Sequence, residues 1–262
     1  MSAIDVVKVG YIKELLAKDV REDSRGLMDG RKVIVKCNVI ENAEGSAQVD
    51  MGNTRVMVGV KFVLEAPKPD TPNMGNLVMS AELLPLANPQ YEPGPPSPEA
   101  IELARVVDRG IRAGNCINLE GLFVEDGKAW SAYVDIYVLN YDGNLFDASS
   151  MAAMAALAST TVPGVKDGVA DYSDKSSSVK LDNIVTSTTF GKIGGKMLFD
   201  MTGNEEAAAD ARVTIETDGN SVRAMQKGMS GSFTLEELNG LVAESLSRHS
   251  GLKKLIEASA KQ

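Results

Sequence analysis

Residues 132–159 read AYVDIYVLNYDGNLFDASSMAAMAALAS and contain the strongest structural signal in the chain. In Ala132–Asn140, β-branched and aromatic residues dominate, which is typical of a strand. The Asp142-Gly143 pair favours a tight turn. The run Asp147–Ser159 is small or apolar on every side, which predicts a helix that is buried all round and packs close to a sheet. We interpret the methionines of this helix as core residues, in preference to the lining of a cofactor site.

Upstream of this stretch, two segments read as strands and a third is rich in proline. Lys32–Val39 and Thr54–Leu64 contain many β-branched residues that partly alternate, which predicts two antiparallel strands. Nine of the ten prolines fall in Pro67–Pro98, so regular structure is not expected through much of this segment. A helix is predicted over residues 99–113, because Ser97 is a good N-cap and apolar residues recur at helical spacing after it.

The downstream part of the chain begins at a polar, turn-prone segment, Asp171–Ser178. Thr234 and Glu237 have the spacing of a capping box, which predicts a helix to about His249, followed by a short helix to Ala260. Three strands are predicted before this helix, at Lys196–Met201, Ala211–Glu216 and Ser221–Gln226.

Both parts therefore consist of strands followed by a helix. We infer a duplicated strand-and-helix unit in an α/β fold of the α+β type, with helices packed on mixed sheets. The predicted organisation is an N-terminal helix and lead-in at residues 1–30, a first half at residues 31–170 and a second half at residues 179–262.

The composition limits the kinds of partner. The 262 residues carry 27 basic and 36 acidic side chains, for a formal net charge of −9. Any nucleic-acid site must therefore be a local basic patch. No apolar stretch approaches the ~20 residues that cross a bilayer, and no signal-peptide pattern is present, so we expect a cytoplasmic protein without membrane association. Cys37 and Cys116 lie in apolar runs, which is typical of buried free thiols.

The single histidine and a glycine-rich segment both have simple structural interpretations. His249 excludes a three-histidine metal site, and its place before Gly251 predicts the last turn of a helix, where a basic side chain meets exposed carbonyl groups. Gly191–Lys196 superficially resembles a phosphate loop but lacks the GxxxxGK[ST] pattern. A strand is predicted directly after it, so we interpret it as a hairpin turn.

Asp200 is a lone candidate for chemistry, because an acidic residue within an apolar strand is costly unless it is paired or hydrogen-bonded. Acid/base work or Mg²⁺ binding by paired carboxylates needs a second acid nearby. The acids nearest in sequence, Glu205 and Glu206, are expected in a solvated loop. We therefore predict no metal site in this chain.

The helix predicted over residues 99–113 contains a row of arginines. At roughly 100° per residue, Arg105, Arg109 and Arg112 fall within about 60° of one another. Aligned like charges destabilise a helix, so the row needs partners. Glu102 and Asp108 are near enough to supply a salt-bridged, solvated face. The alternative is a stripe that binds phosphate anions through the planar donor fork of each guanidinium.

Several stretches, in order, resemble the RNase PH family, and the resemblance extends over about residues 20–250. Within this family the chain is most similar to the non-catalytic ring subunits of archaeal exosomes, on the segments Pro85–Pro89, Glu92–Pro95, Ile101–Arg109 and Asn144–Ala148. The stretches that carry the wider resemblance are Arg21–Gly26 with Arg31, Glu44–Thr54, Tyr141–Asn144 and Gly191–Asp200.

The resemblance also indicates where this chain departs from active members. They hold phosphate with a basic residue and a hydroxyl just before the strand that corresponds to Ala132–Asn140, where this chain has Lys128-Ala129-Trp130. They carry two aspartates six positions apart, where this chain has Gly194 and Asp200. Phosphoryl transfer depends on such positioning, so the resemblance implies a subunit without catalytic residues or a cofactor of its own.

The partners follow from the same resemblance. It implies a hetero-hexameric ring with a catalytic RNase PH-like homologue, three subunits of each, together with cap subunits that carry RNA-binding domains. Mg²⁺ and inorganic phosphate would act at the partner's site during 3′-to-5′ phosphorolytic degradation. This chain would bind single-stranded RNA near its 3′ end through Arg105, Arg109 and Arg112.

Two other functions stay open at this point. The chain could itself be an active phosphorolytic exoribonuclease that uses Asp200, or it could be a purely structural spacer in the ring. Trp130 is interpreted as an interface or core anchor, in preference to a base-stacking residue.

Overall fold

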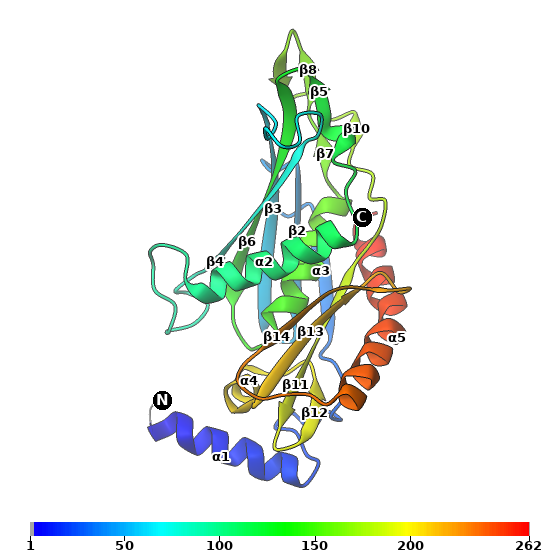
Figure 1. Ribbon diagram of the computed structural model, residues 1–262. Coiled ribbons are helices and arrows are strands. Elements are labelled where there is room, and N and C mark those ends of the chain that lie inside the picture. The colour runs from blue at the N-terminus through cyan, green and yellow to red at the C-terminus, as the bar shows by residue number, and fades with distance from the viewer. Residues whose placement is uncertain (1–2, 262) are drawn as a thin grey trace.

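Figure 1 shows the computed structural model, which describes residues 3–261. Its α-helices are α1 (Ala3–Ala17), α2 (Pro98–Ala113), α3 (Leu145–Ala158), α4 (Gly203–Ala208) and α5 (Leu235–Ser259), with a short 3-10 helix at Glu120–Leu122. The strands are β1 (Val33–Cys37), β2 (Gly45–Met51), β3 (Thr54–Glu65), β4 (Asn76–Leu83), β5 (Phe123–Glu125), β6 (Lys128–Asn140), β7 (Thr161–Val162), β8 (Gly164–Lys166), β9 (Val169–Asp171), β10 (Ser177–Ser178), β11 (Thr186–Ile193), β12 (Lys196–Phe199), β13 (Ala211–Thr217) and β14 (Val222–Gly228).

The first sheet contains six strands in the order β1-β2-β3-β6-β4, with β5 paired to β6. All its pairs are antiparallel except β4 with β6, which is parallel. The strands predicted at Lys32–Val39 and Thr54–Leu64 are found as β1 and β3, but they do not pair with each other. The unpredicted β2 lies between them, and its buried Ala47 and Val49 are separated by the polar Gln48.

The proline-rich segment contains one regular element that the sequence reading missed. No proline occurs between Pro72 and Pro85, and β4 occupies this interval as a sheet edge beside β6. An edge position tolerates the flanking prolines because their missing donors are not needed in a ladder. The expectation of little regular structure through much of this segment is confirmed, since β4 is its one strand and the loop between β4 and α2 has no helix or strand.

The apolar helix α3 lies between the two sheets, as its lack of a polar face predicts. It contacts β2 and β3 on one side and β11 on the other. The backbones approach closely, because a Cβ atom on Gly45 would lie 2.6 Å from the carbonyl oxygen of Ala156. Met151 and Met154 are buried core residues. Trp130 is also buried and packs edge-on against Phe62, so it is a core anchor.

The second sheet has the antiparallel order β12-β11-β13-β14. The predicted strands of this half are present, and the glycine-rich segment forms the turn between β11 and β12, where Gly194 and Gly195 have φ values of +55° and +85°. Such a turn confirms the hairpin interpretation. β11 itself was not predicted, because it begins with the polar run Thr186–Thr189.

The last helix differs from its prediction. The capping box of Thr234 and Glu237 is present, but α5 continues as one helix of 25 residues through Gly251. The helix continues because Ile256, beyond the glycine, is buried in the core of the first half. The capping role predicted for His249 is therefore wrong. The ring lies buried in mid-helix, with Nδ1 2.9 Å from the hydroxyl of Thr186.

Two remaining expectations concern the cysteines and membranes. Cys37 and Cys116 are free thiols, and Cys116 is buried. Burial raises the pKa of the Cys116 thiol to about 12, so it is chemically inert at neutral pH. None of the helices in residues 3–261 combines the length and the apolar character needed to cross a bilayer.

The turn between β6 and α3 gives a test of the fold. Gly143 has φ +79°, and a Cβ there would lie 2.4 Å from the carbonyl oxygen of Met201, whereas Gly127 has φ +78° and open space around it. We expect Gly143→Ala to lower the free energy of unfolding by about 3 kcal/mol or more, through the left-handed backbone and overpacking together. Gly127→Ala should cost only about 1 kcal/mol. Urea denaturation of both variants measures the difference, and equal losses would contradict the close packing at Gly143.

Candidate nucleic-acid interface

Helix α2 carries the predicted arginine row and lies where the two halves meet. It begins as predicted, with the Ser97 side chain accepting a hydrogen bond from the Ala100 amide and Pro98 in the first turn. Its buried face, which includes Leu103, Val107 and Ile111, packs into the first core. The same helix contacts β4 of the first sheet and β14 of the second. The opposite face is therefore held rigidly at the junction (Figure 1).

The three arginines of this face have different surroundings. Arg112 Nε donates to both carboxylate oxygens of Asp108, at 2.9 and 2.8 Å, and the same side chain also bonds the Leu77 carbonyl. The predicted pairing with Asp108 is thus confirmed for Arg112. Arg109 Nη2 donates to the side-chain carbonyl of Gln226 at 2.7 Å. Arg105 is exposed and has no hydrogen bond or ion pair to any side chain in the described part of the chain.

The other predicted partner, Glu102, does not pair with the arginine row. Its carboxylate accepts from Arg212 of β13 at 3.0 Å and from the Gln226 amide at 3.2 Å. Glu102 is therefore engaged by residues outside the row, and Asp108 is engaged by Arg112 at the C-terminal end of the row. Arg105 and Arg109 keep their positive charge available to an external anion.

A groove of about 610 Å³ runs along this face of α2. Arg105, Arg109 and Gln226 line it, together with Ile101, Val106 and two acids, Glu102 and Asp108, that are paired with Arg212 and Arg112. Guanidinium groups match the oxygens of a phosphodiester in a bidentate manner, and the methylene stems of arginine also cover apolar surface. The groove has the chemistry of a site for a single-stranded nucleic-acid backbone.

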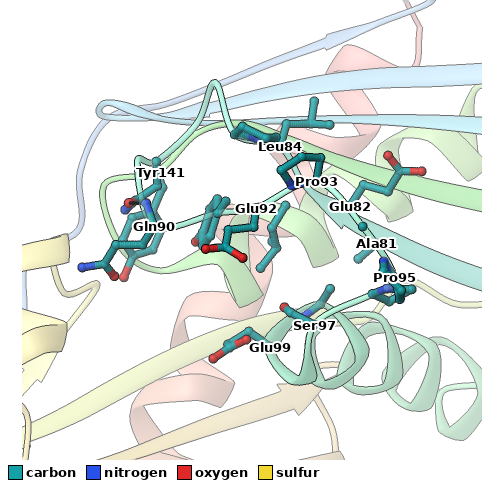
Figure 2. Close-up of a pocket in the computed structure, with 17 residues that line it drawn as sticks. Ala81, Glu82, Leu84, Gln90, Glu92, Pro93, Pro95, Ser97, Glu99 and Tyr141 are labelled. Carbon is teal, nitrogen blue, oxygen red and sulfur yellow. Dashed lines mark hydrogen bonds between the residues drawn. The ribbon is translucent and has the colours of Figure 1, made fainter.

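A second cavity, of about 760 Å³, lies at the N-terminal end of α2 and is acidic. Figure 2 shows its walls, with Glu92 on the loop after β4 and Glu99 on α2. Glu82 also lines it, and none of its lining residues is basic. Because carboxylates repel phosphate, this cavity is unsuited to a polyanion, unlike the groove, whose Arg105 is unpaired within residues 3–261.

A buried carboxyl group lies directly under the arginine helix. Glu216 of β13 is 1% exposed, and neither of its side-chain oxygens has a hydrogen-bond partner. Its carboxyl packs against Gly110, where any Cβ would approach within 2.2 Å. Burial raises the pKa of Glu216 from 4.5 to about 8, with the charge of Arg109 opposing the shift and that of Asp147 adding to it. The group is therefore neutral at physiological pH.

Asp200, the lone candidate for chemistry, is fully engaged by protein donors. Its Oδ1 accepts from Arg31 Nη2 at 2.7 Å and from Asn144 Nδ2 at 2.8 Å, and its Oδ2 accepts from the Arg31 backbone amide and from Arg25. Burial opposes its ionisation, but the hydrogen bonds and charge of Arg31 and the hydrogen bond of Asn144 prevail, and the pKa lies below its usual range. Asp200 is an ionised structural anchor.

The acids after Asp200 were expected in a solvated loop, but this expectation is wrong. Glu205 and Glu206 lie in helix α4 and bind other parts of the chain. Glu205 is buried and accepts two hydrogen bonds from Arg21, at 2.9 and 2.6 Å. Glu206 accepts from the Tyr141 hydroxyl at 2.7 Å and from the Asn144 amide at 2.8 Å. The Thr202–Glu205 capping box was visible in the sequence as a helix signal. The long-range partners had no such signal.

Lys128, Gly194 and Asp200 occupy the positions that the sequence comparison matched to catalytic groups of active family members. The structure does not bring these three residues together. Lys128 begins β6, whereas the Asn144 that binds Asp200 follows its end, and 13 residues of strand separate these points by about 40 Å. Gly194 is exposed in the hairpin turn at the far end of β12 from Asp200. Lys128 instead donates to Glu125 and to the Gly168 carbonyl. The prediction that these positions mark a single reaction centre whose catalytic groups are missing is therefore wrong.

The buried Glu216 predicts a pH effect on stability. Its pKa is higher folded than unfolded, so between pH 5 and pH 8 the unfolded state binds fewer protons and stability falls by up to about 1.4 kcal/mol per pH unit from this group. We expect Glu216→Gln to remove this part of the slope, because the amide does not titrate. Urea denaturation of the variant and the parent at pH 5, 6.5 and 8 measures it. Parallel pH profiles would show that Glu216 is ionised in the folded protein.

Comparison with known proteins agrees with this architecture. Residues 29–163 match the 3′ exoribonuclease family, domain 1, and residues 183–248 match domain 2 of the same family. The chain is 43% identical over 252 residues to the exosome complex component Rrp42 of Pyrococcus furiosus, covering 94% of this chain and 91% of the relative. It is 45% identical to the Archaeoglobus fulgidus Rrp42, over 88% of each chain.

A solved structure extends the likeness to three dimensions. A chain of the Archaeoglobus fulgidus exosome with RNA bound to the active site superimposes with a TM-score of 0.89 and 39% identity, covering 97% of this chain and 99% of that one. The two matched domains together span most of the sequence, and the fold agrees with the RNase PH resemblance of the sequence. This chain belongs to the 3′ exoribonuclease family, the RNase PH family.

Proposed function

We propose that this chain is a ring subunit of an exosome that binds single-stranded RNA near its 3′ end and leaves the chemistry to a catalytic RNase PH-like partner. The observation that carries this proposal is the presentation of Arg105 and Arg109 on a packed helix, where neither forms an ion pair with another described residue. The relatives named exosome complex component Rrp42, at 40–45% identity, support the assembly.

The engagement of the buried acids supports a non-catalytic role. Phosphorolysis needs groups that can hold an attacking phosphate in line and stabilise developing charge. In this chain Asp200 and Glu205 form ion pairs with buried or half-buried arginines, and Asp147 accepts from Ser187 and Thr189. Each of these carboxylates thus has a structural function and is not available to a metal ion or a substrate.

The remaining parts of the proposal concern partners. We propose a ring of three copies of this chain and three of its catalytic homologue, with cap subunits that carry RNA-binding domains, acting in the cytoplasm. Mg²⁺ and inorganic phosphate would bind at the partner's site. The acidic cavity beside α2 supports a defined path for RNA. The glutamates of this cavity repel the RNA backbone, which leaves the arginine groove as the path of the RNA.

The RNA-binding role predicts the effect of removing the arginines. Arg105→Ala with Arg109→Ala should weaken binding of a single-stranded oligoribonucleotide to the assembled ring by about tenfold or more and flatten its salt dependence. Arg112→Ala should have a smaller effect, since Asp108 already neutralises it. Fluorescence anisotropy without phosphate measures affinity. Arg223→Ala, which removes an exposed charge paired with Asp218, is the control. Unchanged affinity in an intact ring would favour the structural spacer.

The non-catalytic role predicts the behaviour of the isolated chain. Incubated alone with phosphate, Mg²⁺ and a 3′-ended RNA, the chain should release no nucleoside diphosphate, whereas addition of the catalytic partner should start release. Chromatography of the nucleotides measures both reactions. Phosphate-dependent release by the purified chain alone would identify it as an active phosphorolytic exoribonuclease.

A further inference from the structure

The partner of Arg109 is a neutral amide, although carboxylates lie close by. Arg109 Nη2 donates to Gln226 Oε1 at 2.7 Å, and no ion pair to Arg109 occurs within the described residues. Arg112, three residues further along the same helix, has a different kind of contact, because it forms an ion pair with Asp108. The fold thus gives neighbouring arginines two kinds of contact: one with a compensating charge and one without.

The orientation of the Gln226 amide is fixed from its other end. Gln226 Nε2 donates to Glu102 Oε1 at 3.2 Å. This contact turns the carbonyl oxygen of the same amide toward Arg109, from which it accepts. Glu102 is held in turn by Arg212 at 3.0 Å. Arg212 lies 4.3 Å above the ring of Phe146, in the first turn of α3. A continuous row of contacts therefore leads from the central helix to the guanidinium in the groove.

Neither Glu102 nor Glu216 forms an ion pair with Arg109. Glu102 is paired with Arg212, which compensates it. Glu216, beneath Gly110, is buried with both oxygens unpartnered, and burial raises its pKa to about 8, so it is protonated at neutral pH. Arg109 is held in place but keeps a full positive charge.

We propose that Gln226 is a positioning residue for RNA, which orients Arg109 toward a backbone phosphate without neutralising it. This inference rests on the proposed RNA-binding function of the groove. A carboxylate at position 226 would form an ion pair with the same guanidinium and compete with phosphate for it, and it would lose the hydrogen bond to Glu102. An apolar residue would leave the charge intact but let the side chain occupy many rotamers, which weakens binding through lost preorganisation.

These two roles can be separated by the salt dependence of binding. In the ring assembled with its catalytic partner, and without phosphate, a labelled single-stranded oligoribonucleotide is titrated at several salt concentrations. Gln226→Glu should weaken binding roughly five- to tenfold and reduce the slope of log affinity against log salt by about 0.7, as should Arg109→Ala, because one phosphate contact is lost. Gln226→Met should weaken binding about threefold with the slope unchanged, since the charge remains.

Controls distinguish failure of this inference from failure of the proposed function. Ser221→Glu adds the same charge at an exposed position before β14 and should leave the slope unchanged. If Arg109→Ala reduces affinity but Gln226→Glu and Gln226→Met do not, Gln226 has no positioning role and the RNA site stands. If Arg105→Ala and Arg109→Ala together have no effect, the RNA site itself fails. Size-exclusion chromatography confirms ring assembly, and Gln226→Met tests the proposal where Gln226→Glu does not assemble.

Discussion

Two buried acidic side chains, Asp147 and Asp200, join the halves of this molecule. Asp147 of α3 accepts hydrogen bonds from Ser187 and Thr189 of β11. Asp200, at the end of β12, accepts from Arg31 ahead of β1. A charge or dipole buried between sheets is costly unless its donors are in place, so only one relative arrangement of the halves satisfies both groups. α3 is thereby fixed as the central layer.

The geometry of the arginine groove depends on this junction. α2 packs on α3 and touches β4 of the first sheet and β14 of the second, so its outer face combines side chains from both halves. Arg105 and Arg109 come from the helix, whereas Gln226 comes from the second sheet. A site built in this way is complete only when the halves are docked. It also explains how a chain with a net charge of −9 can present a local cationic surface.

Local patterns in the sequence predicted the elements that obey local rules. The strand before Asn140, the buried helix after it and the arginine face of α2 were predictable because their periodicity is decided within a few residues. β2 was missed because the polar Gln48 interrupts its apolar residues, and β11 was missed because its polar Thr188 is stabilised by Ser245, a partner 57 residues along the chain. The same limit applies to the site. The bond between Asp108 and Arg112 was predictable at helical spacing, whereas Arg212, which binds Glu102, and Arg31, which binds Asp200, lie more than 100 residues from those acids.

The continuous helix α5 has a consequence for how the protein is made. Its 25 residues extend over about 37 Å, from the second sheet, where Leu241 is buried, to the first core, where Ile256 is buried. Ile256 follows the other buried members of this core by about 70 to 210 residues, so all of them are synthesised before it. The apolar core of the first half is therefore complete only after the second sheet and most of α5 have been made. A chain that ends before Ile256 lacks this part of the core.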